Sequence, residues 1–259
     1  MSRKRHTAAD EPHFLVRTWA SEFRDEQALA PHAHPWGQLI YSVSGVMSVW
    51  TEQGSWVAPP HWAVWAPAGV AHAMRFTGDA SLRTLYLRPG IVGLASNSAV
   101  IAVSALLREL ILRAIEIGFL DARESLHTAM TDLIVHELRA HATPALDLPL
   151  PQSALLRRIA EHVAQAPSDS SGHVKLAMTF GVGVRTLERG FAAETGLSFG
   201  RWRRQARLLH ALRRLGAGAP VKQAALDAGY QSASAFIAAF RETFDTTPVR
   251  YFQAGRSKS

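Results

Sequence analysis

The sequence contains no cysteine among its 259 residues. Disulfide bonds, thiolate metal sites and a cysteine nucleophile are therefore excluded. No run of about eighteen consecutive apolar residues occurs either, so neither a membrane-spanning helix nor a membrane partner is expected. The segment Met1–His6 is basic, but the apolar stretch of a secretory signal does not follow it. Together these absences predict a cytoplasmic protein.

Charge is unevenly distributed between the two parts of the chain. Residues 1–150 contain 12 Lys and Arg against 14 Asp and Glu, which gives a net charge of −2. Residues 151–259 contain 16 against 7, which gives +9. Because concentrated positive charge attracts polyanions, the second part is expected to have a polyanion as its partner.

Short β-forming runs, punctuated by glycine and proline, fill the segment from Pro31 to Leu87. The clearest are Gln38–Val43, Val46–Trp50, Trp62–Trp65 and Leu82–Leu87. Short strands at this spacing predict an antiparallel barrel or sandwich. From Ser153 onward the pattern is helical throughout, so the expected fold is α+β, with a β-barrel domain before an all-α domain.

Two amphipathic segments follow the β-rich region, Ile101–Gly118 and a second that begins at Asp121 and ends near His141. They carry more apolar surface than a small barrel needs, so residues 101–141 are predicted to form a homodimer. Three prolines in residues 143–152 predict a short, stiff linker. The expected divisions are a flexible arm at 1–18, a β-rich and dimerisation domain at 19–142, the linker at 143–152, and a helical domain at 153–259.

An internal repeat organises the helical part, because Ala177-x3-Gly181 recurs 48 residues later as Ala225-x3-Gly229. A glycine turn between two short helices is typical of a helix-turn-helix. The predicted units are Val174–Phe180 with Val184–Glu194, and Val221–Ala228 with Ser232–Phe244. A basic helix at Phe199–Leu215 separates them and would span roughly 25 Å, at ~1.5 Å per residue. This length would place the two second helices about one DNA turn, ~34 Å, apart.

The segment from Leu176 to Tyr251 resembles the AraC/XylS family of bacterial transcription regulators. The matching residues are Leu176, Ala177, Gly181, Arg185, Thr186, Leu187, Arg189, Phe191, Glu194, Thr195, Gly196, Ser198, Phe199, Trp202, Arg203, Arg207, Leu208, Ala211, Val221, Ala225, Gly229, Tyr230, Ser232, Ser234, Phe236, Phe240, Pro248 and Tyr251. Three positions depart from the family pattern. Gly183 stands where serine is frequent, and Asp245 replaces a common glycine. Gly190 replaces a large apolar residue, so a packing gap is expected there.

The resemblance implies that exposed positions early in each second helix contact base edges. In the first unit these are Arg185, Glu188 and Arg189, whose groups match guanine and cytosine edges. In the second unit only Gln231 and Ser234 can hydrogen-bond to bases, which predicts looser reading of the sequence there. The expected phosphate contacts are Arg203, Arg204, Arg207, Arg241 and Arg250.

Histidines in the first part form a second motif. His32, His34 and Gln38 share strand parity, and His72 follows a Pro-x-Gly turn. This pattern is similar to the two metal-binding motifs of the cupin barrel, although glutamate usually stands where Gln38 does. The resemblance implies one divalent Zn, Ni, Mn or Fe ion. In the alternative interpretation the histidines only line a pocket or bond the backbone. The expected effector pocket comprises Trp36, Ile40, Trp50 and Trp65.

These features together favour a ligand- or metal-responsive bacterial DNA-binding transcription regulator that is not an enzyme. Its expected partners are double-stranded operator DNA, a small-molecule effector, a second copy of the chain and, if it activates transcription, RNA polymerase. One alternative is a cupin metalloenzyme, a dioxygenase or isomerase, with an accessory nucleic-acid-binding domain. Another is a structural nucleic-acid binder without effector control. The missing glutamate argues against the enzyme, and the intact front domain argues against the structural binder.

Overall fold

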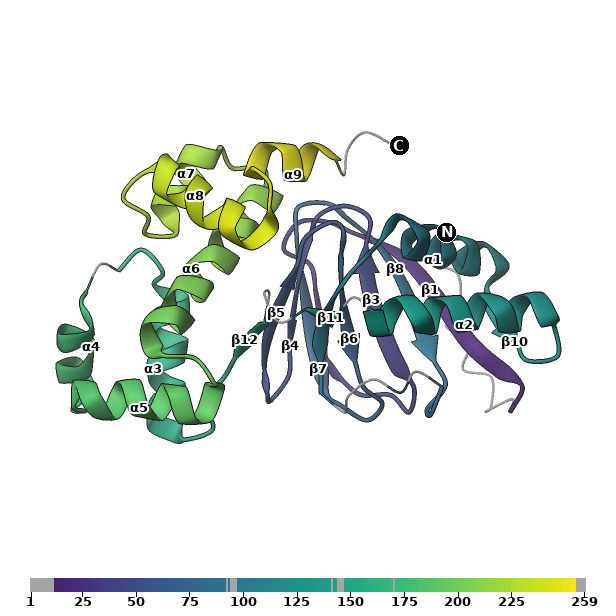
Figure 1. The fold of residues 1–259 in the computed structure, drawn as a ribbon, viewed down its shortest axis with the longest axis horizontal. Coiled ribbons are helices and arrows are strands. Elements are labelled where there is room, and N and C mark those ends of the chain that lie inside the picture. The colour runs from purple at the N-terminus through teal and green to yellow at the C-terminus, as the bar shows by residue number, and fades with distance from the viewer. Residues whose placement is uncertain are drawn as a thin grey trace. The chain divides into compact units, whose positions relative to one another are not determined.

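The computed structural model describes residues 12–91, 93, 97–140, 142–143, 147–169 and 171–254. The chain forms two compact units (Figure 1), of which the first comprises residues 1–51 and 58–145, and the second residues 52–57 and 146–259. The predicted flexible arm at 1–18 is too long, because Phe14–Phe23 forms the first strand, β1. Residues 1–11 of that arm lie outside the described residues.

The strands of the first part of the chain form two sheets rather than one closed barrel. A seven-stranded antiparallel sheet has the order β10-β1-β8-β3-β6-β9-β11, and a five-stranded sheet has the order β12-β5-β4-β7-β2. The strands after β1 are β2 (Ala28–His32), β3 (Gly37–Ser42), β4 (Val46–Trp50), β5 (Gly54–Ala58), β6 (Trp62–Ala66), β7 (His72–Thr77), β8 (Ala80–Leu87), β9 (Ala99–Ala102), β10 (Phe119–Asp121), β11 (Ala142–Thr143) and β12 (Asp147–Pro149).

Strand alternation divides the side chains of the seven-stranded sheet between two faces. On one face Leu39, Trp65 and Leu85 join a core formed with the two helices of the first unit. On the opposite face Gln38 and Tyr86 pair in register, and Gln38 reaches His72 of the five-stranded sheet. This inner face therefore holds the predicted polar site, whereas the outer face supports the helices.

The helices α1 (Ala105–Ile117) and α2 (Ser125–Ala140) lie side by side against the seven-stranded sheet (Figure 1). Both begin later than the sequence predicts. Ala99–Ala102 pairs with β6 as a strand, and the Ser104 hydroxyl caps α1 by accepting a hydrogen bond from the Leu107 main-chain nitrogen at 3.0 Å. Likewise, Phe119–Asp121 pairs with β1 before α2 begins. The predicted stop at Gly118 is confirmed.

The second unit contains α3 (Ala154–Gln165), α4 (His173–Thr179), α5 (Val184–Thr195), α6 (Phe199–Gly216), α7 (Val221–Asp227), α8 (Ala233–Phe244) and α9 (Pro248–Ala254). These bounds confirm the two predicted helix-turn-helix units, α4–α5 and α7–α8, and the basic helix α6 between them. Gly181 and Gly229 occupy the turns at φ +65° and +78°, a backbone conformation that favours glycine. Part of the predicted linker is a strand, since Asp147–Pro149 pairs with β5.

Close packing of the second unit corrects one prediction. A Cβ on Gly190 would lie 2.6 Å from Leu156 Cδ1, so the side chain of Leu156 in α3 fills the expected gap. Asp245 takes the left-handed conformation, φ +52°, that the more common glycine would adopt after α8. Phe191, Phe236 and Phe240 are fully buried and belong to the core of this unit. Among the described helices, none is long and apolar enough to cross a membrane.

Candidate functional site

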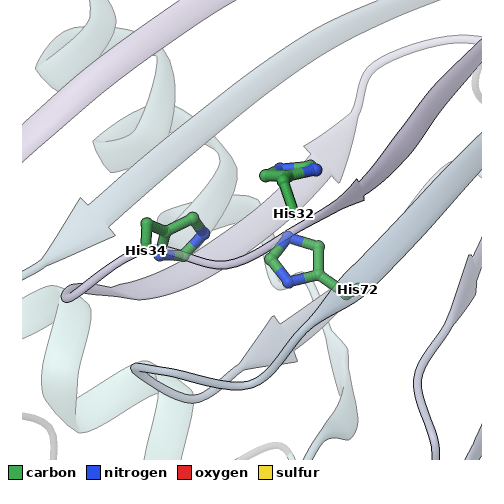
Figure 2. A group of neighbouring side chains, drawn as sticks. All are labelled: His32, His34 and His72. Atoms are coloured by element: carbon green, nitrogen blue, oxygen red, sulfur yellow. The ribbon is translucent and has the colours of Figure 1, made fainter.

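The three predicted histidines lie together on the inner side of the first unit, with their rings facing one another (Figure 2). His32 ends β2 and His72 begins β7, and these two residues are paired in register. His34 lies in the connection between β2 and β3. One ring nitrogen from each histidine lies within 4.8 Å of the others. Strand pairing and the Pro-Gly turn thus produce the predicted convergence.

Hydrogen bonds fix which ring nitrogens carry protons. The Nδ1 of His34 bonds the Trp36 carbonyl, and the Nδ1 of His72 bonds the Val70 carbonyl at 2.9 Å. Because a carbonyl only accepts hydrogen bonds, each Nδ1 must donate, and the Nε2 of each neutral ring keeps its lone pair. Burial, together with the nearby His32 and His34, lowers the pKa of His72 to about 4. This ring is therefore neutral at pH 7.

Gln38 adds a third lone pair to the same point. Its Oε1 lies 2.8 Å from His34 Nε2 and 2.9 Å from His72 Nε2. Its Nε2 donates to Thr84 Oγ1 at 3.0 Å, and Thr84 Oγ1 in turn donates to the Leu39 carbonyl. This chain of bonds orients the amide oxygen toward the histidines. The two imidazole rings and the amide oxygen of Gln38 therefore meet at one point, within hydrogen-bonding distance of that oxygen.

The cluster matches the ligand preferences of a divalent transition metal. Imidazole nitrogen and amide oxygen suit Zn, Ni, Mn or Fe in the +2 state. At Zn–N distances of ~2.0–2.1 Å, two ligand atoms of a tetrahedral site lie roughly 3.3 Å apart, so atoms within 4.8 Å need only a small inward movement. The carbonyl partners of His34 and His72 are the outer hydrogen bonds that commonly orient metal-binding histidines. The residues present therefore fit such an ion.

The four residues of the predicted effector pocket do not share one face, because two lie on the side of the histidines and two do not. Trp36 is 6 % exposed, and Ile40 lies on the same inner face as Gln38. Trp65 lies on the opposite face, in the core with α1 and α2. Trp50 pairs with Ala73, which alternates along β7 with the inward-facing His72, so Trp50 points outward as well. Strand parity separates these residues, but the sequence does not show which face the helices cover.

Sequence reasoning missed two inner-face residues beside the histidines. Tyr86 of β8 packs edge-on against His34, with the ring centroids 5.1 Å apart. Arg17 of β1 stacks on Trp36, with its guanidinium carbon 4.5 Å from the ring centroid. The alternation of side chains along β1 and β8 indicates that both residues face inward. Arg17, however, falls within the segment predicted to be a flexible arm. An open hollow of about 450 Å³ lies at the other end of these strands, near Phe23 and Asp79, and includes none of the predicted effector residues.

In the second unit several predicted DNA contacts are exposed. Arg185 and Arg189 project from α5, and Gln231 and Ser234 lie exposed at the start of α8. The predicted phosphate contacts that are exposed are Arg204, Arg241 and Arg250. Their accessibility is what contact with a duplex requires.

Two predicted phosphate contacts serve the fold instead. Arg203 is only 8 % exposed, and its guanidinium donates to the carbonyls of Ser171 and Asp169. Arg207 donates to the carbonyls of Pro167 and Asp169, each at 3.1 Å. Both arginines lie on the inner side of α6 and tie the segment between α3 and α4 to it. The predicted role of Arg203 is therefore wrong, and the guanidinium of Arg207 is already occupied.

Glu188 also differs from its predicted role as a base contact. Its Oε2 accepts a hydrogen bond from the Phe199 main-chain nitrogen at 3.1 Å, and its Oε1 lies 2.9 Å from His173 Nδ1. Glu194, near the end of α5, accepts hydrogen bonds from the main-chain nitrogens of Gln152 at 2.7 Å and Ser153 at 2.9 Å. These hydrogen bonds hold the pKa of Glu194 below its usual range. The two glutamates of α5 thus cap the starts of α6 and α3.

Comparison with known proteins places both units in one family. Residues 20–130 match the AraC-like ligand binding domain, and residues 176–254 match a helix-turn-helix domain. The HTH-type transcriptional regulator NimR of Escherichia coli is 33% identical over 227 residues, which cover 88% of this chain and 83% of NimR. RipA of Corynebacterium glutamicum is 32% identical over 108 residues, 42% of this chain and 32% of RipA.

Solved structures with similar folds include ToxT of Vibrio cholerae bound to an unsaturated fatty acid. It has a TM-score of 0.38 and 12% identity, and the match covers 95% of this chain and 97% of ToxT. The DNA-binding domain of AdpA in complex with target DNA has a TM-score of 0.39 and 25% identity over 41% of this chain and 96% of that domain.

The chain thus combines a match to the AraC-like ligand binding domain with a tandem helix-turn-helix domain, and its likeness to NimR extends over most of both proteins. This chain belongs to the AraC family of transcriptional regulators.

Proposed function

We propose that the first unit senses a divalent transition metal, together with an effector, at His32, His34, His72 and Gln38. Its occupancy would then control operator binding by the second unit. One observation carries this proposal: one ring nitrogen from each of the three histidines lies within 4.8 Å of the others, and Gln38 Oε1 lies 2.8 Å from His34 Nε2 and 2.9 Å from His72 Nε2. A bound ion would supply positive charge at this point and an open position for an effector atom. The protein's own residues would orient the ligands through the carbonyls of Trp36 and Val70.

Metal analysis of the purified full-length protein tests the site directly. Dialysis against Zn²⁺, Ni²⁺, Mn²⁺ or Fe²⁺ should leave about one ion per chain, and the affinity should fall as the pH drops, because a protonated imidazole cannot ligate. His34→Ala should remove the ion, whereas His162→Ala, a substitution in the exposed side of α3, should retain it. Equal metal content in the two variants would exclude the proposed site.

A gel shift with the DNA upstream of the chain's own gene tests the control step. Mobility with and without a chelator should differ for the unaltered protein and should not differ for His34→Ala. DNA binding by His34→Ala should persist, because the helix-turn-helix domain belongs to the second unit and His34 to the first. We propose that the chain acts through operator DNA, and through RNA polymerase where it activates transcription, without catalysing a reaction.

We also propose that the chain dimerises through α2. Leu126, Ala129, Leu133 and His136, here called the α2 stripe, are exposed and follow the alternating three- and four-residue spacing of a coiled-coil seam. Leu126 is 65 % exposed and Leu133 is 46 % exposed, which is unfavourable for apolar side chains on an isolated surface. Sedimentation should show a dimer that Leu133→Glu dissociates and Leu226→Glu, an equally exposed leucine on α7, does not.

A further inference from the structure

Arg17 lies in the same row of residues as the ligand Gln38. On the seven-stranded sheet Arg17 of β1 pairs with Tyr86 of β8, and Tyr86 pairs with Gln38 of β3. Residues that pair directly across neighbouring strands point to the same face. Because adjacent strands lie ~4.8 Å apart, Arg17 and Gln38 are separated by about 10 Å of sheet, a distance that an arginine side chain largely spans.

The guanidinium of Arg17 lies against two aromatic rings, and one of its nitrogens has no hydrogen-bond acceptor among the described residues. It stacks on Trp36 and lies 5.7 Å from the ring centroid of Phe14. Its Nη2 is buried, and no group among the described residues accepts a hydrogen bond from it. A buried cationic donor is normally paired, and its ion pair or hydrogen bond is what keeps it inside a fold. This donor is therefore preorganised for an acceptor that the described residues do not supply.

Two of the groups around Arg17 also contact the histidine cluster. Trp36, beneath the guanidinium, accepts a hydrogen bond from His34 through its carbonyl. Tyr86, beside Arg17 in the row, packs edge-on against the His34 ring. Trp36 and Tyr86 thus connect Arg17 to the histidine cluster on one face of the sheet. The ion pairs among the described residues include neither Arg17 nor the three histidines.

We infer that the effector is a small organic carboxylate whose carboxylate pairs with Arg17, near Trp36 and Tyr86. The inference rests on the proposed function, because it places the effector beside the three-histidine site. The planar guanidinium matches a carboxylate through two parallel hydrogen bonds. A single arginine among aromatic side chains favours a singly charged, partly apolar anion over a phosphate, which collects several cationic groups. The neutral Gln38 adds no negative charge that would repel such a ligand.

Calorimetric titration of the full-length protein with matched probes tests the inference. The probes are benzoate, phenylacetate and butyrate, with benzamide as the uncharged analogue of benzoate and inorganic phosphate as the alternative anion. At least one carboxylate should bind, and benzamide and phosphate should bind at least tenfold more weakly. Arg17→Gln should weaken carboxylate binding at least tenfold, and Arg17→Lys should restore part of it. Arg75→Gln removes an exposed arginine on the outward face of β7 and should change nothing.

Metal content and thermal unfolding, measured on the same variants, keep the outcomes separate. Arg17→Gln should bind metal and unfold like the unaltered protein, so that lost carboxylate binding reports the ligand contact. If the protein binds no metal but still binds a carboxylate through Arg17, the metal proposal fails and this inference stands. If metal binds normally and no probe binds up to millimolar concentrations, the inference is overturned. Equal binding by Arg17→Gln, or tighter binding of phosphate, would overturn it as well.

Discussion

The Oε2 of Glu188 accepts a hydrogen bond from the main-chain nitrogen of Phe199 across 3.1 Å. This bond joins the recognition helix of the first helix-turn-helix unit to the first turn of the basic helix α6. The first amide groups of a helix have no partner within it, and a carboxylate satisfies them and complements the positive end of the helix dipole. Glu188 therefore positions α5 against α6 within the helix-turn-helix domain.

Replacement of Glu188 should affect stability more than base preference. Glu188→Gln retains the shape but loses the charge, and a weakened cap of this kind costs about 1 kcal/mol of unfolding free energy. Urea unfolding measures the loss, and gel shifts on operator variants measure the preference. Glu161→Gln, an exposed glutamate within α3 and away from its first turn, provides a control. If Glu188→Gln changed the preference at one base pair and left stability unchanged, the prediction that Glu188 contacts a base would be supported instead.

Arg189 and Arg204 should behave differently from each other on DNA. Arg189 is exposed on α5, and Arg189→Ala should relax specificity at one base pair in each site, at a cost of ~1–3 kcal/mol. Arg204 is exposed on α6, and Arg204→Ala should weaken binding to all sequences by similar factors. Competition gel shifts with specific and unrelated duplexes separate the two effects. Identical losses on both duplexes for both variants would contradict this division.

The helical unit was largely predictable because its signals are local. Glycine turns, apolar periodicity and a basic helix mark its elements within a few residues of one another. The helical phase of α6 also separates its arginines: Arg203 is four residues after Phe199 and three before Ala206, both buried. Arg203 therefore belongs to the inner face, and Arg204 to the outer one. The prediction that both arginines contact phosphates rests on their charge alone and does not consider which face of α6 each one occupies.

The sensor unit was less predictable because its site is built by pairing between distant strands. Spacing placed His32, His34 and Gln38 on one face, and the Pro-Gly turn returned His72 to them. The face to which a tryptophan points depends on which side α1 and α2 cover, which no local pattern records. Trp65 was misplaced for that reason, and Arg17 was missed because β1 begins before the expected domain start.

Arg203 should prove more important to folding than to DNA affinity. Its buried guanidinium donates to the carbonyls of Ser171 and Asp169, and Arg207 also donates to the Asp169 carbonyl. Arg203→Ala therefore leaves the Ser171 carbonyl without this donor, at a cost of ~1–3 kcal/mol. With Arg204, Arg241 and Arg250 as phosphate contacts, the log–log dependence of DNA affinity on salt should have a slope of about −3 per subunit. Arg204→Ala should reduce the magnitude of that slope by about one, and a folded Arg203→Ala should leave it unchanged. A reduction by Arg203→Ala, measured where the variant remains folded, would show that this side chain does reach the duplex.

The second unit should lose stability in mild acid because of His210. Burial lowers the pKa of this histidine to about 4, and the positive charges of Arg213 and Arg214 add to the shift. An unfolded histidine titrates near 6.5, so as the pH falls from about 6.5 to 4 the unfolded chain takes up a proton that the folded chain does not. Stability is therefore unaffected by this group above pH 6.5 and falls below it, by of order 1–3 kcal/mol at pH 4. His210→Gln should remove that part of the decline in urea unfolding curves, whereas the exposed His162→Gln should not. Parallel pH profiles for His210→Gln and the unaltered protein would show that His210 takes up its proton as readily when folded as when unfolded.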